Sequence, residues 1–286
     1  MSQSLSALFQ YISENDSNHR YFAVDVGAHF GEFSKFLLSS GLFCKVIAFE
    51  PNAKSYLKLL DNVKCTSSYE FEPVQRALSS TNGKLSLYCD ADTATASLLR
   101  YGADYLNNGS VNQHIVPVTT LDTFLDDNSS NSRLLLLKID TQGNDLAVIN
   151  GAIHSISTYR PIIQVEFIYI PLYMNQCAPN QLIATLAGLN YELFALDNLH
   201  NTLEGRLAFC DAIFIPKEMK IPSSQKFVCI NDKQSLMQQI DILNNVCAER
   251  LSIIELLDSE LRRLNNPRKK RSIVSSVAQK VRAWVR

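Results

Sequence analysis

The stretch YFAVDVGAHFGEF at residues 21–33, followed by KVIAFEP at residues 45–51, decides the fold of this chain. The first stretch predicts an apolar strand that ends at Asp25-Val26-Gly27, a loop with Gly27 and Gly31, and then a helix. The second predicts another apolar strand, which ends in Glu50. A strand, a glycine loop, a helix, a second strand and a carboxylate about twenty residues on form the arrangement with which Rossmann-like domains hold a nucleoside. Gly27 can adopt a positive φ and let a ligand approach the backbone, and Glu50 can accept hydrogen bonds from two ribose hydroxyl groups.

The composition fits one globular α/β domain with an appendage, because 286 residues with 46% hydrophobic side chains are enough to bury a full core. The charge is divided unevenly: residues 267–286 carry seven Lys or Arg and no acid, whereas residues 1–266 carry 20 Lys or Arg and 28 Asp or Glu. Seven cysteines without a C-x-x-C pair argue for a reducing compartment and against a disulfide framework or a zinc site. The first twenty residues lack the features of a secretory signal, and no segment reaches the roughly 18 apolar residues that a membrane span needs. We therefore expect a cytoplasmic protein.

Apolar runs that alternate with helical patterns predict a mostly parallel, doubly wound α/β sheet. The run LLLLKID at 134–140 is typical of a central strand buried on both faces. The last two strands are joined by the turn-like DNLHNTLEGR, which predicts an antiparallel edge hairpin. Strands are expected at 21–26, 45–50, within 70–79, and at 84–90, 134–140, 161–167, 191–196 and 210–216. A surface loop is expected over 91–112. The segment at 114–125 is expected to start extended and to turn helical from an N-cap at Thr120. Helices are expected at 3–14, 32–40, 53–62, 145–157 and 179–188.

The chain divides into an N-terminal helical segment at 1–20, the α/β domain at 21–222, an amphipathic helix within 223–266 and a basic tail at 267–286. Residues 234–264 carry a heptad-like apolar seam, which indicates either a coiled coil that forms a homodimer or a single helix packed on its own domain. The tail can form a basic amphipathic helix, which would lie on an anionic membrane surface, or it can stay solvated. The acidic body argues against nucleic-acid binding.

The spacing of the glycine loop favours a ligand without phosphate. Gly27 and Gly31 are spaced G-x-x-x-G, whereas nicotinamide enzymes usually carry G-x-G-x-x-G, whose backbone amides hold a pyrophosphate. Asp25 precedes the loop, and its carboxylate would repel phosphate but can receive an amine or a hydroxyl group. A ligand with a ribose, an amino-acid end and no phosphate fits this pattern, and S-adenosyl-L-methionine is such a ligand.

Six blocks of sequence, in order and at natural spacing, resemble the FkbM-type methyltransferase family. They are DVGAHFG (25–31), AFEP (48–51), QRALS (75–79), TTLDTFL (119–125), LLKIDTQGNDLAVINGA (136–152) and RPIIQVEF (160–167), and the resemblance covers about residues 20–217. The resemblance implies a Rossmann-like class I methyltransferase fold, S-adenosyl-L-methionine as the methyl donor, and transfer usually to a hydroxyl oxygen.

Carried over by position, the resemblance implies a cofactor site at one edge of the sheet. Asp25 and the two loop glycines would line the methionine end, Glu50 would bind the ribose, and the residues around Arg76, at the end of the third strand, would lie near the adenine. The full set expected for the cofactor is Asp25, Gly27, Ala28, Gly31, Glu50, Pro51, Arg76, Ala77, Leu78 and Asp140, the last facing the transferring methyl group. Independently, ligands of open α/β sheets bind at the carboxyl ends of strands, which places Asp25, Glu50, Asp140 and Glu166 on one rim.

The chain departs from the family pattern at two positions. His29 stands where the loop often carries Asn, and Gln142 stands where the block after the fourth strand often carries an acid. An amide cannot take a proton at neutral pH, so the base that a hydroxyl nucleophile needs must be another residue. The expected catalytic residues are Asp140, Glu166 and His29, with Asp145 as a further candidate base. Asp140 and Glu166 could also hold a divalent metal, but no ligand-rich cluster indicates one, and no metal site is predicted.

Each of these residues also has a purely structural interpretation. Asp25 could cap the loop that follows it, and Glu50, before a proline, could be a helix N-terminal acid. Asp140 could orient backbone amides, Glu166 could pair with a Lys or Arg, and His29 could pack or form hydrogen bonds without a catalytic role.

The sequence therefore predicts an S-adenosyl-L-methionine-dependent O-methyltransferase. The expected acceptor is a sugar hydroxyl of a bacterial surface glycan or its lipid-linked precursor, although fold resemblance does not fix a substrate. If the tail binds lipid, the protein works at the inner face of the membrane. The alternatives are a non-catalytic nucleotide-binding or scaffold protein of a glycan-assembly complex, in which Gln142 marks lost activity, and an NAD-dependent oxidoreductase.

Overall fold

The computed structural model describes residues 2–16, 20–63, 70–89, 93–102, 111–127 and 132–221. The chain divides into two compact units, 1–229 and 230–286, and all described residues belong to the first. The predicted heptad helix at 234–264 and the basic tail at 267–286 lie outside the described residues. Among the residues described, no helix has the length and apolar character to cross a membrane.

A seven-stranded sheet forms the centre of this unit, with the strand order β3-β2-β1-β7-β8-β10-β9. The first five strands in this order, β3 to β8, are parallel to one another. Strand β10 runs antiparallel to both β8 and β9. The strands are β1 (Tyr21–Val26), β2 (Phe43–Phe49), β3 (Glu70–Val74), β7 (Arg133–Ile139), β8 (Ile162–Ile168), β9 (Tyr191–Asn201) and β10 (Leu207–Pro216). The predicted Rossmann-like sheet with an antiparallel edge hairpin is confirmed.

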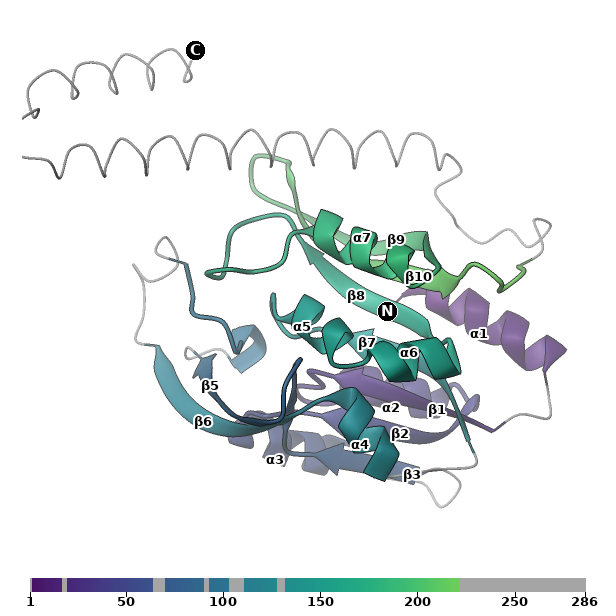
Figure 1. Ribbon diagram of the computed structural model, residues 1–286, viewed down its shortest axis with the longest axis horizontal. Coiled ribbons are helices and arrows are strands. Elements are labelled where there is room, and N and C mark those ends of the chain that lie inside the picture. Colours follow the sequence, from purple (N-terminus) through teal and green to yellow (C-terminus); the bar gives the residue numbers. More distant parts are fainter. Residues whose placement is uncertain are drawn as a thin grey trace, which may run out of the picture. The chain divides into compact units, whose positions relative to one another are not determined.

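Helices cover both faces of the sheet, as a doubly wound fold requires. In Figure 1, α4, α5 and α6 lie in front of the sheet, and α2 and α3 lie behind it. The helices are α1 (Gln3–Asn15), α2 (Glu32–Ser39), α3 (Ala53–Asn62), α4 (Leu121–Asp127), α5 (Asp145–Asn150), α6 (Ile153–Tyr159) and α7 (Pro179–Gly188). Burial on both faces explains why β1 and β7 read as continuous apolar runs in the sequence. The apolar face of α1, including Leu5, Leu8 and Phe9, joins the core with Leu37 and Phe43.

A second, three-stranded sheet with the order β4-β6-β5 was not expected from the sequence, which placed Arg76, Ala77 and Leu78 at the end of the third strand of the main sheet. It consists of β4 (Ala77–Leu78), β5 (Gly83–Cys89) and β6 (Asn112–Thr119). The third strand of the main sheet ends at Val74, because the Arg76 N–H bonds to the Val74 carbonyl in a turn and Ala77–Leu78 then pairs with β6. The strand predicted at 84–90 likewise belongs to this small sheet, where β5 runs antiparallel to β6.

Three predicted boundaries also differ from the structure. The helix expected at 145–157 is divided at Gly151, because the Asp122 carboxylate accepts the N–H groups of His154 and Ser155 and so begins a new helix, α6. A Cβ at Gly151 would lie 2.1 Å from the Ser79 carbonyl oxygen, which shows how closely the chain passes there. The turn expected at 197–206 is shorter, since β9 continues to Asn201 in register with Leu207. The expected surface loop over 91–112 includes a 3-10 turn, η1 (Thr93–Thr95), and the buried Ser97, which pairs with Tyr88.

Candidate active site

Glu50 lies immediately after β2, and the local backbone holds its carboxylate. One carboxylate oxygen accepts the His29 N–H at 2.8 Å, and the other accepts the Asn52 N–H, also at 2.8 Å. Asn52 in turn caps α3 by accepting the N–H groups of Lys54 and Ser55. Burial raises the pKa of Glu50 to about 7, against the two backbone hydrogen bonds, which lower it. Each oxygen retains a lone pair, so Glu50 can accept two further hydrogen bonds.

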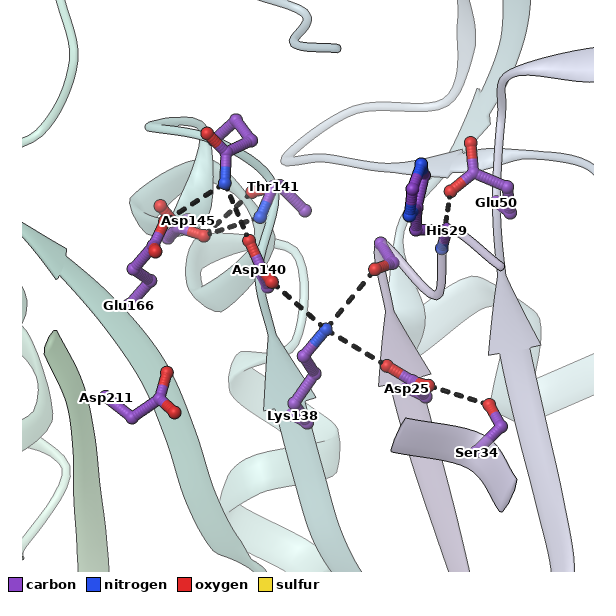
Figure 2. A network of polar contacts seen from close by, with 12 residues as sticks. Asp25, His29, Ser34, Glu50, Lys138, Asp140, Thr141, Asp145, Glu166 and Asp211 are labelled. Atoms are coloured by element: carbon purple, nitrogen blue, oxygen red, sulfur yellow. Dashed lines mark hydrogen bonds and ion pairs between the residues drawn. The ribbon is translucent and has the colours of Figure 1, made fainter. Parts of the chain in front are cut away.

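Lys138 places one buried ammonium group between the loops after β1 and β7. Its Nζ lies 3.2 Å from Asp25 Oδ1 and 3.4 Å from Asp140 Oδ2, and it donates to the Gly27 carbonyl oxygen at 3.3 Å (Figure 2). The second oxygen of Asp25 accepts the Ser34 hydroxyl at 2.7 Å. Burial acts to lower the pKa of Lys138, but the two carboxylates outweigh it and raise that pKa above its usual range. The fully buried Asp25 is therefore paired inside the fold.

Gly27 lies where these two loops meet most closely. Its φ is +76°, and a Cβ added there would lie 1.9 Å from the Asp140 carbonyl oxygen. The Asp140 N–H bonds to the Val26 carbonyl, and the Gly27 N–H bonds to the Phe49 carbonyl. The ends of β1, β2 and β7 are thus joined by backbone hydrogen bonds directly below the candidate site, and only glycine fits at their junction.

Asp140 and Glu166 are joined by the side-chain amide of Gln142. Its Nε2 donates to Asp140 Oδ1 at 3.0 Å and to Glu166 Oε2 at 3.1 Å. Burial raises the pKa of Glu166 to about 9, with further increases from Asp140, Asp145 and Asp211. The pKa of Asp211, whose strand β10 is in register with β8 at Glu166, is also raised, chiefly by burial. This side of the sheet edge therefore concentrates carboxyl groups.

The loop between β7 and α5 is fixed from below by Asp145. This buried carboxylate accepts the Thr141 N–H and hydroxyl, each at 2.9 Å, and the Gly143 N–H at 3.2 Å. Burial raises the pKa of Asp145 to about 6. Its oxygens are directed into the loop, which favours a structural role for Asp145 over that of a base.

A cavity of about 240 Å³ opens between the two sheets. Glu50 and Asp140 face it from the main sheet, Leu78 and Leu87 from the small sheet, and Ser97 from the segment after η1. The cavity is also lined by Val26, Gly27, His29, Phe49, Pro51, Arg76, Ala77, Ala94, Ala96, Leu98, Thr141, Gln142 and Asn144. It therefore combines apolar walls with carboxylates at separate positions, the usual character of a small-molecule site.

The cavity brings together most, but not all, of the residues expected from the sequence. Those lining it are Gly27, His29, Glu50, Pro51, Arg76, Ala77, Leu78 and Asp140, whereas Asp25, Ala28, Gly31 and Glu166 are not among its lining residues. Asp25 is held by Lys138 and Ser34 behind the loop, and Glu166 reaches the cavity-lining loop through Gln142.

His29 lies beside Glu50 and apart from Asp140 (Figure 2). Its ring stacks on Phe30 with the centroids 3.6 Å apart, and its backbone has a φ of 49°. His29 therefore lines the same cavity as Asp140 but lies on its Glu50 side.

Two parts of the site were missed by the sequence reasoning. Lys138 stands inside the apolar run LLLLKID, and a lysine in a buried strand must find a carboxylate, which was the available signal. The wall formed by Ala94, Ala96 and Leu98 comes from a stretch without a clear periodic pattern, and it carried no comparable signal. In the part of the chain that the structure describes, no three His, Cys, Asp or Glu side chains are grouped so as to hold a metal ion.

Residues 25–193 match the sequence profile of the Methyltransferase FkbM domain. Among solved structures, the chain is similar to the methyltransferase FkbM from Methylobacillus flagellatus KT, with 15% identity, a TM-score of 0.44, and 74% of this chain and 55% of that chain covered. It is also similar to a putative tRNA (m1A22) methyltransferase from Streptococcus pneumoniae, with 11% identity, a TM-score of 0.43, and 99% and 97% coverage. A third is a putative methyltransferase from Streptococcus mutans in complex with SAH, with 9% identity, a TM-score of 0.40, and 75% and 99% coverage.

The chain spans about half the length of the Methylobacillus protein. A comparison with curated proteins found no match.

Proposed function

This chain belongs to the FkbM methyltransferase family, and we propose that it transfers a methyl group from S-adenosyl-L-methionine to a hydroxyl oxygen. The observation that carries the proposal is the arrangement of two carboxylates around one cavity: Glu50 at one position, held by backbone N–H groups, and Asp140 at another. The first is suited to a ribose and the second to a reacting hydroxyl group.

The residues around the cavity fit the proposed donor. Glu50 has acceptor capacity left for two ribose hydroxyl groups, and Leu78, Leu87 and Leu98 provide apolar surface of the kind that an adenine ring requires. The loop from Gly27 to Gly31 brings backbone close to the cavity without a phosphate-binding pattern. Bound S-adenosyl-L-methionine would supply an electrophilic methyl group on a sulfonium.

Asp140 is placed to receive the proton that a hydroxyl acceptor loses. Its side chain is 38% exposed, and it lines the cavity. Lys138 and Gln142 each donate toward one of its oxygens, which fixes the carboxylate in place. Because the methyl donor is already activated, alignment and proton removal are the main demands on the protein.

We further propose that the acceptor is a sugar hydroxyl of a bacterial surface glycan or its precursor. This proposal is supported by the family resemblance, and the neutral character of such an acceptor suits a site with one carboxylate placed as a base. Contact with a membrane through residues 267–286 and dimerisation through residues 234–264 remain predictions, since both segments lie outside the described residues.

Titration calorimetry with S-adenosyl-L-homocysteine tests the donor site. We expect micromolar binding of this product and no binding of NAD. Glu50→Ala should weaken binding about 5- to 150-fold, because the lost ribose hydrogen bonds contribute roughly 1–3 kcal/mol. Glu192→Ala, which removes an exposed glutamate on β9, is the matched control and should leave the dissociation constant unchanged. An equal dissociation constant for Glu50→Ala and the wild-type protein would contradict the site.

Transfer of a labelled methyl group to a panel of glycans and nucleotide sugars tests the acceptor. Product is expected with hydroxyl acceptors. Tight binding of the donor product without transfer to any acceptor would favour the scaffold alternative.

A further inference from the structure

Gln142 has its whole side-chain amide engaged between groups that could take part in the reaction. Nε2 donates one hydrogen bond to Asp140 and one to Glu166, while Oε1 accepts the Tyr173 hydroxyl at 2.9 Å. The orientation of this amide follows from chemistry. Two carboxyl groups at one end require N–H donors, and a phenol O–H at the other end can donate to the carbonyl oxygen.

The backbone prevents this amide from moving away. Gln142 has a φ of 54°, in the left-handed region, and its carbonyl oxygen accepts the Ser97 hydroxyl at 2.7 Å. Asp145 accepts the N–H groups on both sides of it, from Thr141 and Gly143. A side chain on a loop held at three points is suited to positioning its neighbours.

The two carboxyl groups that share the amide have different surroundings. Asp140 lines the cavity and has Lys138 Nζ at 3.4 Å. Glu166 lies on β8 among like charges. The titratable and charged groups around it are Asp140, Asp145 on α5, Asp211 and Cys210 on β10, Lys138 on β7, and Tyr173 beyond the amide. Burial and the three aspartates raise the pKa of Glu166 to about 9, so its carboxyl group keeps its proton at neutral pH.

We propose that Gln142 is a positioning residue whose amide holds two unlike carboxyl groups together: Asp140, which faces the cavity beside Lys138, and Glu166, which lies among other acids and carries a proton. Asp140, which lines the cavity, then takes the proton of the reacting hydroxyl group, while Glu166, which is not among the lining residues, acts through Gln142. The part that concerns the acceptor rests on the proposed function, whereas the protonation of the pair does not.

In this arrangement the amide of Gln142 donates a hydrogen bond to each carboxyl group, which an acid at this position could not do. With an acid there, three carboxyl groups would meet and the N–H donors would be lost. The carboxamide keeps the shape and supplies a hydrogen to each carboxyl group. Gln142 thereby keeps Asp140 at the cavity and Glu166 beside it in one fixed arrangement.

Infrared difference spectroscopy of the protein without ligands tests the protonation directly. At about pH 7.5 we expect, besides a weaker band from partly protonated Glu50, the C=O band of a protonated carboxyl group that is absent in Glu166→Gln and retained in Asp140→Asn. Loss of that band in Asp140→Asn with retention in Glu166→Gln, or no such band in the wild-type protein, would overturn the proposal. Because no methyl donor is needed, this result is independent of calorimetry with S-adenosyl-L-homocysteine, which tests the proposed function.

Gln142→Met tests the role of the amide. Removal of its N–H groups should move the midpoint at which the Glu166 band disappears upward by about 0.5 to 1 pH unit, because hydrogen bonds to the ionised form favour ionisation. Gln142→Glu should move the acid limb of the kcat/KM profile upward by a similar or larger amount. Gln181→Met, which removes an amide in the first turn of α7, is the control and should move neither.

A lower kcat for both Gln142 variants with unchanged midpoints would indicate a merely structural role and would overturn the assignment. Thermal unfolding of each variant shows whether it folds. Should Gln142→Met not fold, Tyr173→Phe keeps the test open, since it releases the far end of the amide and should broaden the same titration while Gln181→Met does not.

Discussion

Glu50 and Glu166 are both glutamates at the carboxyl edge of one sheet, and burial raises the pKa of each, yet they are held in different ways. Backbone N–H groups fix Glu50, whereas the side chain of Gln142 holds Glu166. The position of a carboxylate held by backbone N–H groups is fixed by the fold, which suits it to bind a part of a ligand that is the same in every reaction. A carboxyl group held by another side chain can be altered by one substitution.

The largest effect is expected at Lys138, which contacts Asp25 and the Gly27 carbonyl at the end of β1 and Asp140 at the end of β7. Lys138→Met leaves the fully buried Asp25 without its cation and should lower the free energy of unfolding by about 3–5 kcal/mol. Urea denaturation measures this loss. Lys45→Met is the control, because Lys45 pairs with Glu70 and Glu72 near the surface and should lose less than about 1 kcal/mol. Equal losses in the two variants would show that Lys138 does not link the ends of β1 and β7.

The close packing of the backbone beside Glu50 can be tested at Gly27. Gly27→Ala should cost at least about 2 kcal/mol of stability, because a Cβ would meet the Asp140 carbonyl oxygen in addition to the strain of a left-handed φ. Gly205→Ala is a matched control, since Gly205 has a φ of +78° but no atom within 4 Å of an added Cβ. It should cost only the backbone strain, about 1 kcal/mol. If the two variants melt at the same temperature, the close approach of the two loops is not as described.

The ionisation of Glu50 should make donor affinity depend on pH. With a pKa of about 7, Glu50 loses acceptor capacity as the pH falls through that value. The affinity for S-adenosyl-L-homocysteine should therefore decrease below about pH 7, by up to tenfold per pH unit. Calorimetry across pH measures this effect. In Glu50→Gln the affinity should be weaker and independent of pH over the same range, and a persistent slope would assign the titration to another group.

The last prediction concerns the pH dependence of stability that Glu166 contributes. Its folded-state pKa of about 9 is above the ordinary value of about 4.3, so the native state retains a proton that the unfolded state releases. The free energy of unfolding should therefore fall as the pH rises between about 4 and 9. Glu166→Gln removes this contribution, so the stability curves of the variant and the wild-type protein should diverge as the pH rises over this range. Parallel stability curves for the two proteins would contradict the raised pKa.

The sequence predicted the main sheet well, and it placed Gly27, Glu50 and Asp140 at strand ends, where the structure has them, because both depend on local patterns. Gly27, Glu50 and Asp140 follow directly from apolar strands, and each strand end marks its position. The separate sheet at Ala77–Leu78 was not foreseen, since two residues after a turn carry no periodicity that could show which strand they pair with.

The contacts that Gln142 makes with Asp140 and Glu166 were less predictable for a different reason. The bridge from Gln142 to Glu166 joins residues 24 positions apart through one amide, and only the folded chain brings them together. The sequence marked Gln142 as a missing base. The structure shows instead that both ends of its amide are occupied.

The ammonium group of Lys138 has one further consequence. Its three hydrogens are shared among Asp25, the Gly27 carbonyl and Asp140, so a molecule that displaces Asp140 also alters the environment of the glycine loop. Thermodynamic reciprocity then requires that whatever settles against the glycine loop change the affinity at Asp140 by the same factor. Lys138 would thus couple the affinities for the two proposed co-substrates through a single nitrogen atom.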